Sequence, residues 1–494
     1  MRVQTVSIAA TLLLGGGVLA ACRPVVPPPT PPPPTTTTTT AAPALPALTP
    51  AKWTSPNLDG TIQAQPVLFP DPSLLNGVGV VVVATENDSV YGLNPVDGTM
   101  LWGPISIGTP QPLSENDAFG PVQTLSGCGD INPLGITSNP VLDNGSVWVV
   151  GEREHNPAGS SPHQPEHVIA GINPVNGDFV LNPVVIDPPA MTVATVGSTQ
   201  NEVSAEQQRT GLVATNGHVY VGFGGLSGDC GPYHGFVVDV SETDGSIGGY
   251  FESATASTVT NDREGAVWAP GGIAVDSSTS TIYAATGNSA DGSSPPASGD
   301  NSDAVVQLPF PLPSSPTNPT HVFQPSTFAS DNQSDLDLGS SAPLLVDNGT
   351  QVFQIGKRGT GYLLNKSDLS LVTQLSVCSG GTFGNVVTLG TSIFVPCRGS
   401  VMKQLVLGSG TMSAGWTSPS DVAAGGPATV DPISNLVFSA DSGSNQLFGV
   451  NVSTGAAMMR YQLALTGSEH FPTPGVGNGQ VFIESGLTVK AFPT

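Results

Sequence analysis

One short stretch recurs along the chain and limits the folds open to it. The sequence VVVVATENDSVYGLNPVDGTMLW, at 80–102, alternates apolar segments with polar turns and ends at Trp102. Valine runs favour strands buried on both faces, and Asp-Gly between apolar segments predicts a hairpin turn. Copies follow at 167–180, 235–247 and 446–459. A hairpin that returns every ~50 residues cannot bury its own apolar face, so it must stack on copies of itself.

The number of copies predicts a closed ring of sheets. After Pro50 the chain shows strand and turn patterns without a sustained helical period. Strongly apolar segments recur, most of them preceded by a shorter strand, at 80–85, 146–150, 218–223, 281–285, 351–355, 392–396, 435–440 and 480–484. Eight four-stranded units around one axis make an all-β fold, an eight-bladed β-propeller. Seven blades are the alternative if one of these segments is not a strand.

The two ends of the propeller region complement each other. The last unit stops after its third strand, at 487–492, and is one strand short. The segment at 52–55 has no unit of its own. We expect this N-terminal strand to complete the last blade, because that pairing closes the ring and covers an open strand edge.

The first fifty residues predict export and a membrane tether. An apolar run after Arg2 is too short and too glycine-rich to span a membrane but is typical of a signal peptide. It ends in Leu-Ala-Ala-Cys, which resembles a bacterial lipobox and implies removal of residues 1–21 and lipidation of Cys22. An ordinary signal peptide with a chance cysteine is the alternative. Residues 22–50 are a Pro/Thr-rich stalk that favours the extended polyproline conformation. The propeller is expected at 51–494, outside the cytoplasm.

The charge of the chain limits its partners. It has 13 Lys and Arg against 37 Asp and Glu, for a net charge of −24. Nucleic acid and anionic membrane surfaces are poor partners for such a chain, because both require clustered basic residues. The expected membrane contact is therefore the lipid on Cys22. We expect a monomer that has, at most, a protein partner in the cell envelope.

The cysteines favour disulfides. Apart from Cys22 there are four, an even number that suits an oxidising compartment. Cys378 and Cys397 flank neighbouring ends of one predicted hairpin, and Cys128 and Cys230 fall in loops on one face of adjacent blades. The expected pairs are Cys378–Cys397 and Cys128–Cys230. Metal ligation is the competing interpretation, but the chain contains no CxxC or HExxH motif.

Longer motifs resemble a known family. Between 207 and 301 the chain contains QQRTGL, VYVGFGGLSGDCGPYHGFVVDV, GAVWAPGGIAVD, TIYAATGN and SGDN, and DLDLGSSAPLLV and GKRGTGYLLNKSDL follow. Together with the hairpin repeat, these motifs resemble the bacterial propellers related to pyrroloquinoline quinone (PQQ) dehydrogenases. The resemblance covers most of 51–494 and implies the eight-bladed fold.

The resemblance also implies a cofactor site. In the dehydrogenases of this family, Asp229 would match an acidic calcium ligand, Asn288 an amide ligand, and Asp300 a carboxylate that serves as ligand and general base. Trp268 would stack on the quinone, and Lys357 would contact it. Calcium prefers several oxygen donors, which these residues supply. The ion would polarise the quinone carbonyl while the carboxylate takes the proton of an alcohol.

The chain also departs from the dehydrogenase pattern. Asp229 replaces the usual glutamate, an adjacent cysteine pair is missing, and the absence of a haem motif would require an external electron acceptor. Few blades keep a docking tryptophan, with Trp102 and Trp416 as the best candidates. Asn288 and Asp300 are also residue types that cap tight turns.

Two functions remain open from the sequence. The first is a lipid-anchored scaffold of the cell envelope that binds a ligand or a protein. The alternative is a PQQ- and calcium-dependent dehydrogenase of alcohols or sugars.

Overall fold

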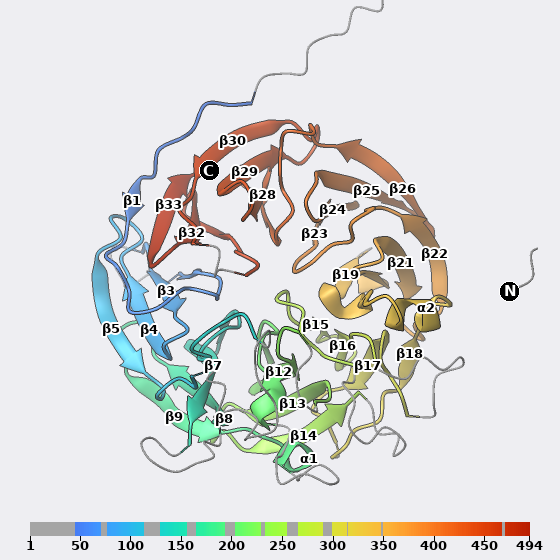
Figure 1. The fold of residues 1–494 in the computed structure, drawn as a ribbon, viewed down its shortest axis with the longest axis horizontal. Helices are drawn as coiled ribbons and strands as arrows, with labels where there is room; N and C mark the ends of the chain where they lie inside the picture. The colour runs from blue at the N-terminus through green and yellow to red at the C-terminus, as the bar shows by residue number, and fades with distance from the viewer. Residues whose placement is uncertain are drawn as a thin grey trace, which may run out of the picture. The chain divides into compact units, whose positions relative to one another are not determined.

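The fold is that of a β-propeller with eight blades (Figure 1). The computed structural model describes residues 45–70, 77–112, 129–155, 165–192, 203–228, 233–253, 265–289, 299–313, 315–346, 349–466 and 470–494. Residues Ala44–Thr494 form one compact unit, in which the strands make eight antiparallel sheets around an axis. The predicted eight-bladed propeller is confirmed, and the seven-bladed alternative is wrong.

The first four blades follow one another in chain order. Blade 1 contains β2 (Val67–Phe69), β3 (Val80–Ala84), β4 (Ser89–Leu93) and β5 (Met100–Ser106). Blade 2 contains β6 (Val141–Asp143), β7 (Ser146–Glu154), β8 (Pro165–Ile172) and β9 (Phe179–Val185). Blade 3 contains β11 (Val213–Thr215), β12 (His218–Gly225), β13 (Phe236–Ser241) and β14 (Ile247–Glu252), with an additional strand, β10 (Glu206–Gln207), on β12. Blade 4 contains β15 (Ala274–Asp276), β16 (Thr281–Ala285), β17 (Val305–Pro309) and β18 (His321–Phe323).

The remaining blades complete the ring. Blade 5 contains β19 (Leu344–Val346), β20 (Gln351–Ile355), β21 (Thr360–Asn365) and β22 (Leu371–Ser376). Blade 6 contains β23 (Val387–Leu389), β24 (Ser392–Pro396), β25 (Met402–Gly408) and β26 (Thr411–Thr417). Blade 7 contains β27 (Ala428–Asp431), β28 (Leu436–Asp441), β29 (Gln446–Asn451) and β30 (Ala457–Gln462). Blade 8 contains β31 (Gly475–Gly477), β32 (Gln480–Ser485), β33 (Thr488–Pro493) and β1 (Trp53–Thr54). The α-helices are short, at α1 (Pro189–Thr192) and α2 (Phe328–Asn332).

The N-terminal strand closes the ring as predicted. Trp53 and Thr54 of β1 pair with Ala491 and Lys490 of β33, and β1 lies beside β33 in Figure 1. The pairing covers the outer edge of blade 8, which would otherwise be open. The first and last described segments of the chain therefore hold each other in place.

The buried strands explain why the repeat is so rich in valine. In β7, Val147 and Val149 pack into a cluster with β3, whereas Trp148 and Val150 pack with β12. Successive side chains of a strand point to opposite faces, so each strand packs apolar side chains against both neighbouring blades. Burial of one such side chain stabilises the fold by about 1.5–3 kcal/mol.

Three tryptophans in outermost strands each tie their blade to the next. The indole N–H of Trp102 in blade 1 donates to the carbonyl of Pro174 in the β8–β9 turn, at 2.8 Å. A Cβ atom on Gly177 of that turn would lie 2.8 Å from the same ring, so the glycine of the repeat makes room for the indole. Two equivalent hydrogen bonds, both at 2.9 Å, join Trp416 to Val452 and Trp53 to Pro95.

A buried ion cluster lies in blade 2. His167 is fully buried, and its Nδ1 lies 2.8 Å from Asp187 Oδ1. Its Nε2 lies 3.6 Å from Glu152 Oε2. Burial alone would lower the pKa of His167, but the two carboxylates raise it to about 10. The imidazole is therefore a buried cation at neutral pH.

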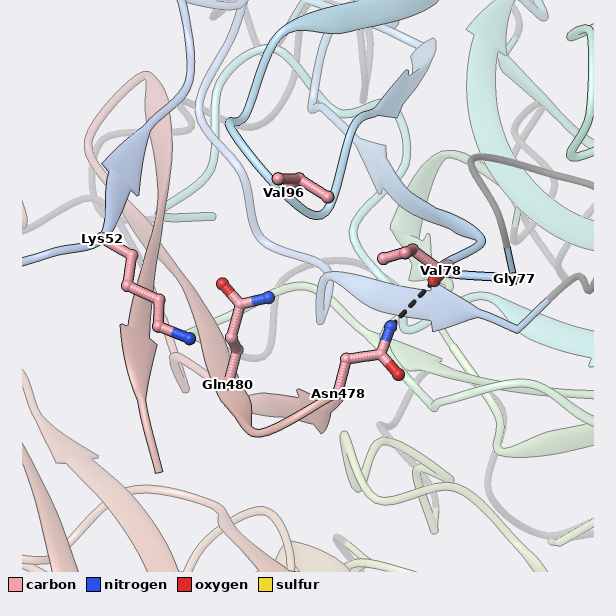
Figure 2. Close-up of a pocket in the computed structure, with 6 residues that line it drawn as sticks. All are labelled: Lys52, Gly77, Val78, Val96, Asn478 and Gln480. Atoms are coloured by element: carbon pink, nitrogen blue, oxygen red, sulfur yellow. Dashed lines mark hydrogen bonds between the residues drawn. The ribbon is translucent and has the colours of Figure 1, made fainter.

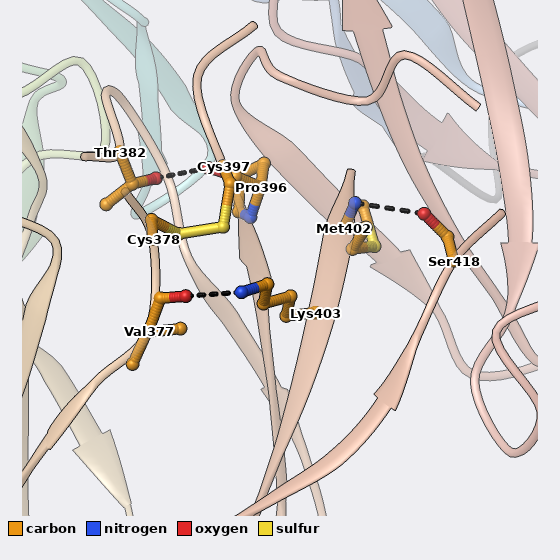
Figure 3. Close-up of a disulfide and its surroundings, with 8 residues drawn as sticks. All are labelled: Val377, Cys378, Thr382, Pro396, Cys397, Met402, Lys403 and Ser418. Carbon is orange, nitrogen blue, oxygen red and sulfur yellow. Dashed lines mark hydrogen bonds between the residues drawn. A yellow bond between two sulfur atoms is a disulfide. The ribbon is translucent and has the colours of Figure 1, made fainter. Parts of the chain in front are cut away.

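One disulfide is present in the described part of the chain. Cys378 and Cys397 are bonded, with their Cα atoms 5.4 Å apart, and they join the loop after β22 to the end of β24 (Figure 3). Cys22 and the expected pair Cys128–Cys230 lie outside the described residues. No helix within the described ranges has the length and apolar character needed to cross a membrane.

Candidate functional site

A cavity of about 590 Å³ lies where the inner loops of the blades converge. Its walls come from loops of blades 2, 3, 4, 5, 6 and 8, which places it on the propeller axis. The family resemblance implies one shared site for Trp268 and Lys357, and both line the cavity. We call it the axial cavity.

Aromatic rings form one part of its wall. Trp268 lies in the loop before β15, and its ring centroid is 6.0 Å from those of Phe383 and Phe471. The rings of Phe383 and Phe471 are 6.0 Å apart and nearly parallel, at 13°. Three blades thus contribute one aromatic cluster, and such clusters prefer offset or tilted arrangements of this kind.

The backbone of Phe471 is strained. Its φ of 60° lies in the left-handed region, where a bulky residue is rarely found. The hydroxyl of Thr473 donates to the carbonyl of Phe471 at 2.9 Å, and the guanidinium of Arg209 lies 5.3 Å from its ring centroid. Strain of this kind persists only where surrounding contacts enforce it, and it is common at binding sites.

An ion-pair network forms a second part of the wall. Lys357 Nζ lies 2.7 Å from Asp337 Oδ2, 2.6 Å from Asp335 Oδ1 and 5.7 Å from the ring of Trp268. Burial opposes the charge on Lys357, but the two carboxylates raise its pKa above the usual value. Asp337 also accepts a hydrogen bond from the backbone N–H of Asn288, at 2.7 Å. Lys357 is therefore held as a charged group facing the cavity.

A buried acid lies behind this network. Asp303 is fully buried, and it accepts a hydrogen bond from the backbone N–H of Leu338 at 2.9 Å. Burial, with a contribution from the nearby Asp337 carboxylate, raises the pKa of Asp303 to about 8. Asp303 therefore carries a proton at neutral pH, which limits the negative charge gathered around Lys357.

Two arginines also face the cavity. Arg209 is 6% exposed and donates to the carbonyls of Thr137, at 2.9 Å, and His470. Burial lowers the pKa of Arg209 to about 10. Arg398 is exposed, and its guanidinium lies 4.4 Å from the ring centroid of Phe383. The carboxylates of Asp130, which also lines the cavity, and Glu484 partly oppose the effect of burial on Arg209.

The other predicted site residues are not part of the described cavity wall. Asn288 and Asp300 are not among the lining residues. Asp300 is 7% exposed, accepts a hydrogen bond from the N–H of Ser302 at 2.8 Å and receives the Ser289 hydroxyl at 3.3 Å. Such bonds are typical of a residue that caps a turn, and the roles of Asp300 as calcium ligand and general base stay predictions. Asp229 lies outside the described residues, so its calcium role stays a prediction.

The residues present fit a quinone cofactor only in part. Trp268 and Lys357 offer a ring face and a cation to a flat anionic molecule. No group of three or more His, Cys, Asp or Glu side chains within the described ranges is arranged to hold a metal. The expected calcium donors Asn288 and Asp300 do not reach the axial cavity. Because Asp229 lies outside the described residues, the calcium site stays a prediction, and no reaction step is assigned to it.

Several cavity residues have no clear signal in the sequence. Arg209 and Asp337 lie inside the quoted motifs QQRTGL and DLDLG, so a functional role for them could have been suspected. Phe383, Arg398 and Phe471 lie in loops outside any recognised motif, and only the closed ring brings them together.

A second hollow, of about 510 Å³, lies where the ring closes. Figure 2 shows Lys52 and Gln480 on one side, and Asn478 donating to the carbonyl of Val78 at 2.8 Å. Neither an acid nor an aromatic ring contributes to its described wall. It therefore has little to orient a ligand, and the axial cavity is the better candidate.

Comparisons with known proteins agree with the fold. No protein-family model matches the chain, and no curated protein sequence matches it. Among solved structures, quinohemoprotein alcohol dehydrogenase ADHIIG from Pseudomonas putida HK5 is similar, with a TM-score of 0.59, 13% identity and coverage of 90% of this chain and 76% of that one. The quinohemoprotein alcohol dehydrogenase from Comamonas testosteroni gives a TM-score of 0.60, 13% identity and the same coverage of 90% and 76%.

A protein of a different kind is also similar. BamB from Moraxella catarrhalis gives a TM-score of 0.53 and 11% identity, over 89% of this chain and 98% of that one. Identities this low establish the fold alone. The chain therefore has the fold of the PQQ-like eight-bladed propellers.

Proposed function

We propose that this protein is a lipid-anchored binding propeller of the bacterial cell envelope. The lipobox-like end of the leader and the Pro/Thr-rich stalk support a tether at Cys22. The Cys378–Cys397 disulfide supports an oxidising, extracytoplasmic compartment, since cytosolic proteins rarely keep such bonds. The axial cavity then supplies the binding site.

The composition of the cavity wall carries this proposal. Arg209, Arg398 and Lys357 face a space of about 590 Å³ beside three aromatic rings, and this is the arrangement of a small-molecule site. The predicted calcium ligands Asn288 and Asp300 lie outside that wall. A binding role requires only the charged and aromatic side chains that line the cavity.

The location can be tested through the tether. Cells that produce the protein should incorporate labelled palmitate into it, and the protein should fractionate with membranes. A Cys22→Ser variant should lose both the label and the membrane association while its propeller stays folded. Recovery of the unaltered protein in the cytoplasm, without label, would refute the proposed location. Sedimentation of the purified protein, together with crosslinking in cells, then tests the expected monomer and any partner in the envelope.

A PQQ-dependent dehydrogenase of alcohols or sugars is the second candidate. It is supported by Trp268 and Lys357 beside one cavity and by the similarity to two quinohemoprotein alcohol dehydrogenases. Calorimetric titration of PQQ into the purified protein, with and without calcium, tests it. Calcium-dependent binding that Asn288→Ala abolishes would favour the dehydrogenase. Absence of binding at micromolar PQQ would leave the binding propeller as the function.

A further inference from the structure

We propose that residues 470–473 form a lid on the axial cavity and that the lid opens by withdrawal of the Phe471 ring. This inference rests on the binding role proposed above and adds how that site is opened. The lid is the loop before β31 of blade 8, and Arg209 is its latch. The latch joins residues that lie 261 positions apart in the chain, so it exists only in the closed ring.

The loop at 470–473 reaches across the propeller axis. In a stack of repeats each unit contacts its neighbours, which for blade 8 are blades 7 and 1. Phe471 instead contacts Trp268 of blade 4 and Phe383 of blade 6. It also contacts Arg209 of blade 3. Blades 4 and 8 are four positions apart in a ring of eight, so they face each other across the axis (Figure 1). The loop therefore covers the cavity that these residues line.

The base of the lid is fixed to the neighbouring blades. The carbonyl of Pro474 accepts hydrogen bonds from Gln65 Nε2 and from the Thr429 hydroxyl, both at 2.6 Å. Gln65 precedes β2 of blade 1, and Thr429 lies in β27 of blade 7. Gly475 then begins β31. Because this end of the loop is attached on both sides, the moving part is limited to 470–473.

The tip of the lid is held by a small number of polar contacts. Arg209 donates to the carbonyl of His470, and its guanidinium lies 5.3 Å from the ring centroid of Phe471. The backbone N–H of His470 donates to Gln63 Oε1 at 3.0 Å. The imidazole of His470 lies 3.3 Å from a carboxylate oxygen of Asp130, but this pair is partly exposed and contributes little. Arg209, which is 6% exposed, is therefore the main latch.

Phe471 is the hinge of the lid, and it is strained in the closed position. Its φ of 60° lies in the left-handed region, and the next residue is Pro472. A residue before proline favours an extended backbone, so the closed conformation is unfavourable for Phe471 on two counts. The Thr473 hydroxyl, which donates to the Phe471 carbonyl at 2.9 Å, helps to hold this conformation. Rotation of Phe471 to an extended backbone relieves the strain and withdraws its ring, which gives the loop two discrete positions.

Hydrogen exchange of the His470 amide distinguishes a lid from a permanent wall. Its N–H is bonded to Gln63 in the closed position and is released when the lid opens. The purified full-length protein, with isotopically labelled histidine, would be followed by NMR in deuterated buffer, and His470→Gln would identify the signal. His167, which is fully buried in β8, serves as the reference for unfolding of the core.

A lid predicts local opening. We expect the His470 amide to exchange faster than that of His167 and to respond much less to low concentrations of denaturant, because a small opening exposes little surface. Exchange of both amides at one rate, with one dependence on denaturant, would show that the loop opens only by unfolding and would overturn the lid. Exchange of His470 at the rate of an unstructured peptide would overturn the latch.

Matched threonine variants test the hinge. Thr473→Val removes the hydroxyl that holds Phe471 and should speed exchange of the His470 amide by about three- to tenfold, as expected for the loss of one hydrogen bond. Thr388→Val removes a hydroxyl-to-carbonyl bond of the same length, 2.9 Å, from blade 6 and should leave this exchange unchanged. An unchanged rate in Thr473→Val, or an equal increase in both variants, would contradict the hinge.

A charge-conserving variant tests the latch. Arg209→Lys keeps a cation near Asp130 and Glu484 but lacks the planar guanidinium that reaches the His470 carbonyl and covers the Phe471 ring. Exchange of the His470 amide should rise by about threefold or more. A folded Arg209→Lys protein with unchanged exchange at His470 would refute the latch.

The lid and the proposed function fail separately. The exchange measurements use neither a ligand nor Cys22, and the labelling and fractionation of the Cys22→Ser variant do not depend on the lid. Exchange of His470 only through unfolding, in a protein that keeps its membrane association, would remove the lid and retain the location. Local opening in a protein found in the cytoplasm would do the reverse.

Discussion

Replacing both Cys378 and Cys397 by alanine should lower the thermal midpoint of unfolding by about 3 °C. The bond joins residues 19 positions apart in the sequence. Loop closure of that length removes about 11 cal/mol/K of entropy from the unfolded chain, which corresponds to about 3 kcal/mol at 25 °C. A unit the size of residues 44–494 has an unfolding entropy of about 0.9 kcal/mol/K near its midpoint. Dividing the lost stability of about 3 kcal/mol by this entropy gives the expected shift of about 3 °C.

The folded state should tolerate this change. Both cysteines are 2% exposed and lie in the core shared by blades 5 and 6. Figure 3 shows hydrogen bonds that remain near the removed bond, from the Thr382 hydroxyl to the Pro396 carbonyl and from Lys403 Nζ to the Val377 carbonyl, both at 2.5 Å. Secondary structure by circular dichroism should therefore match that of the unaltered protein.

Differential scanning calorimetry of the double variant checks the magnitude. A strong reductant, applied to the unaltered protein under conditions that expose the disulfide, should produce the same shift of the thermal midpoint. The reductant should not lower the thermal midpoint of the double variant further. A midpoint within about 1 °C of the unaltered protein would refute the loop-entropy argument.

Three further changes test other parts of the fold. Gly455→Ala should destabilise the protein by about 1–3 kcal/mol more than Gly479→Ala in denaturant titrations. Both glycines have a positive φ, but only at Gly455 would a Cβ atom lie 2.5 Å from the ring of Trp416. Equal losses of stability in the two variants would contradict the docking of Trp416 on this turn. Trp53→Ala should lower the free energy of unfolding by about 3–5 kcal/mol, because it removes a buried ring from the strand that closes blade 8. An unchanged denaturation midpoint would argue against that closure. His167 has its pKa raised to about 10 in the folded state, against 6.5 when unfolded, so its stabilisation should be complete below pH 6.5 and disappear as the pH rises through about 10. His167→Gln should remove this part of the pH dependence of the thermal midpoint, and a variant that retains it would show that another group is responsible.

The blades were predictable because their determinants are local. Alternation of apolar residues and turn residues such as Asp97-Gly98 specify a hairpin within about ten residues of sequence. Counting the hairpins then gave the number of blades. The unmatched segment at 52–55 identified the closing strand. The spacing of Cys378 and Cys397 in one hairpin was also sufficient to predict their bond.

The ends of the strands were less predictable. The strand expected at 146–150 extends to Ser146–Glu154. The docking role of Trp53 was also missed. Its partner, Pro95, belongs to blade 1, and the contact arises only because the N-terminal strand joins blade 8.

Sequence alone determined that this protein is a ring of stacked hairpins, and a family resemblance suggested that Trp268 and Lys357 share one site. Tertiary structure decided which other residues meet them. Arg209, Phe383 and Phe471 come from loops of different blades, and Asp300 lies off the cavity wall although its motif suggested otherwise. The physical reason is that strand and turn preferences act between near neighbours in the chain. Convergence at the axis instead depends on closure of the whole ring and on the conformation of each inner loop.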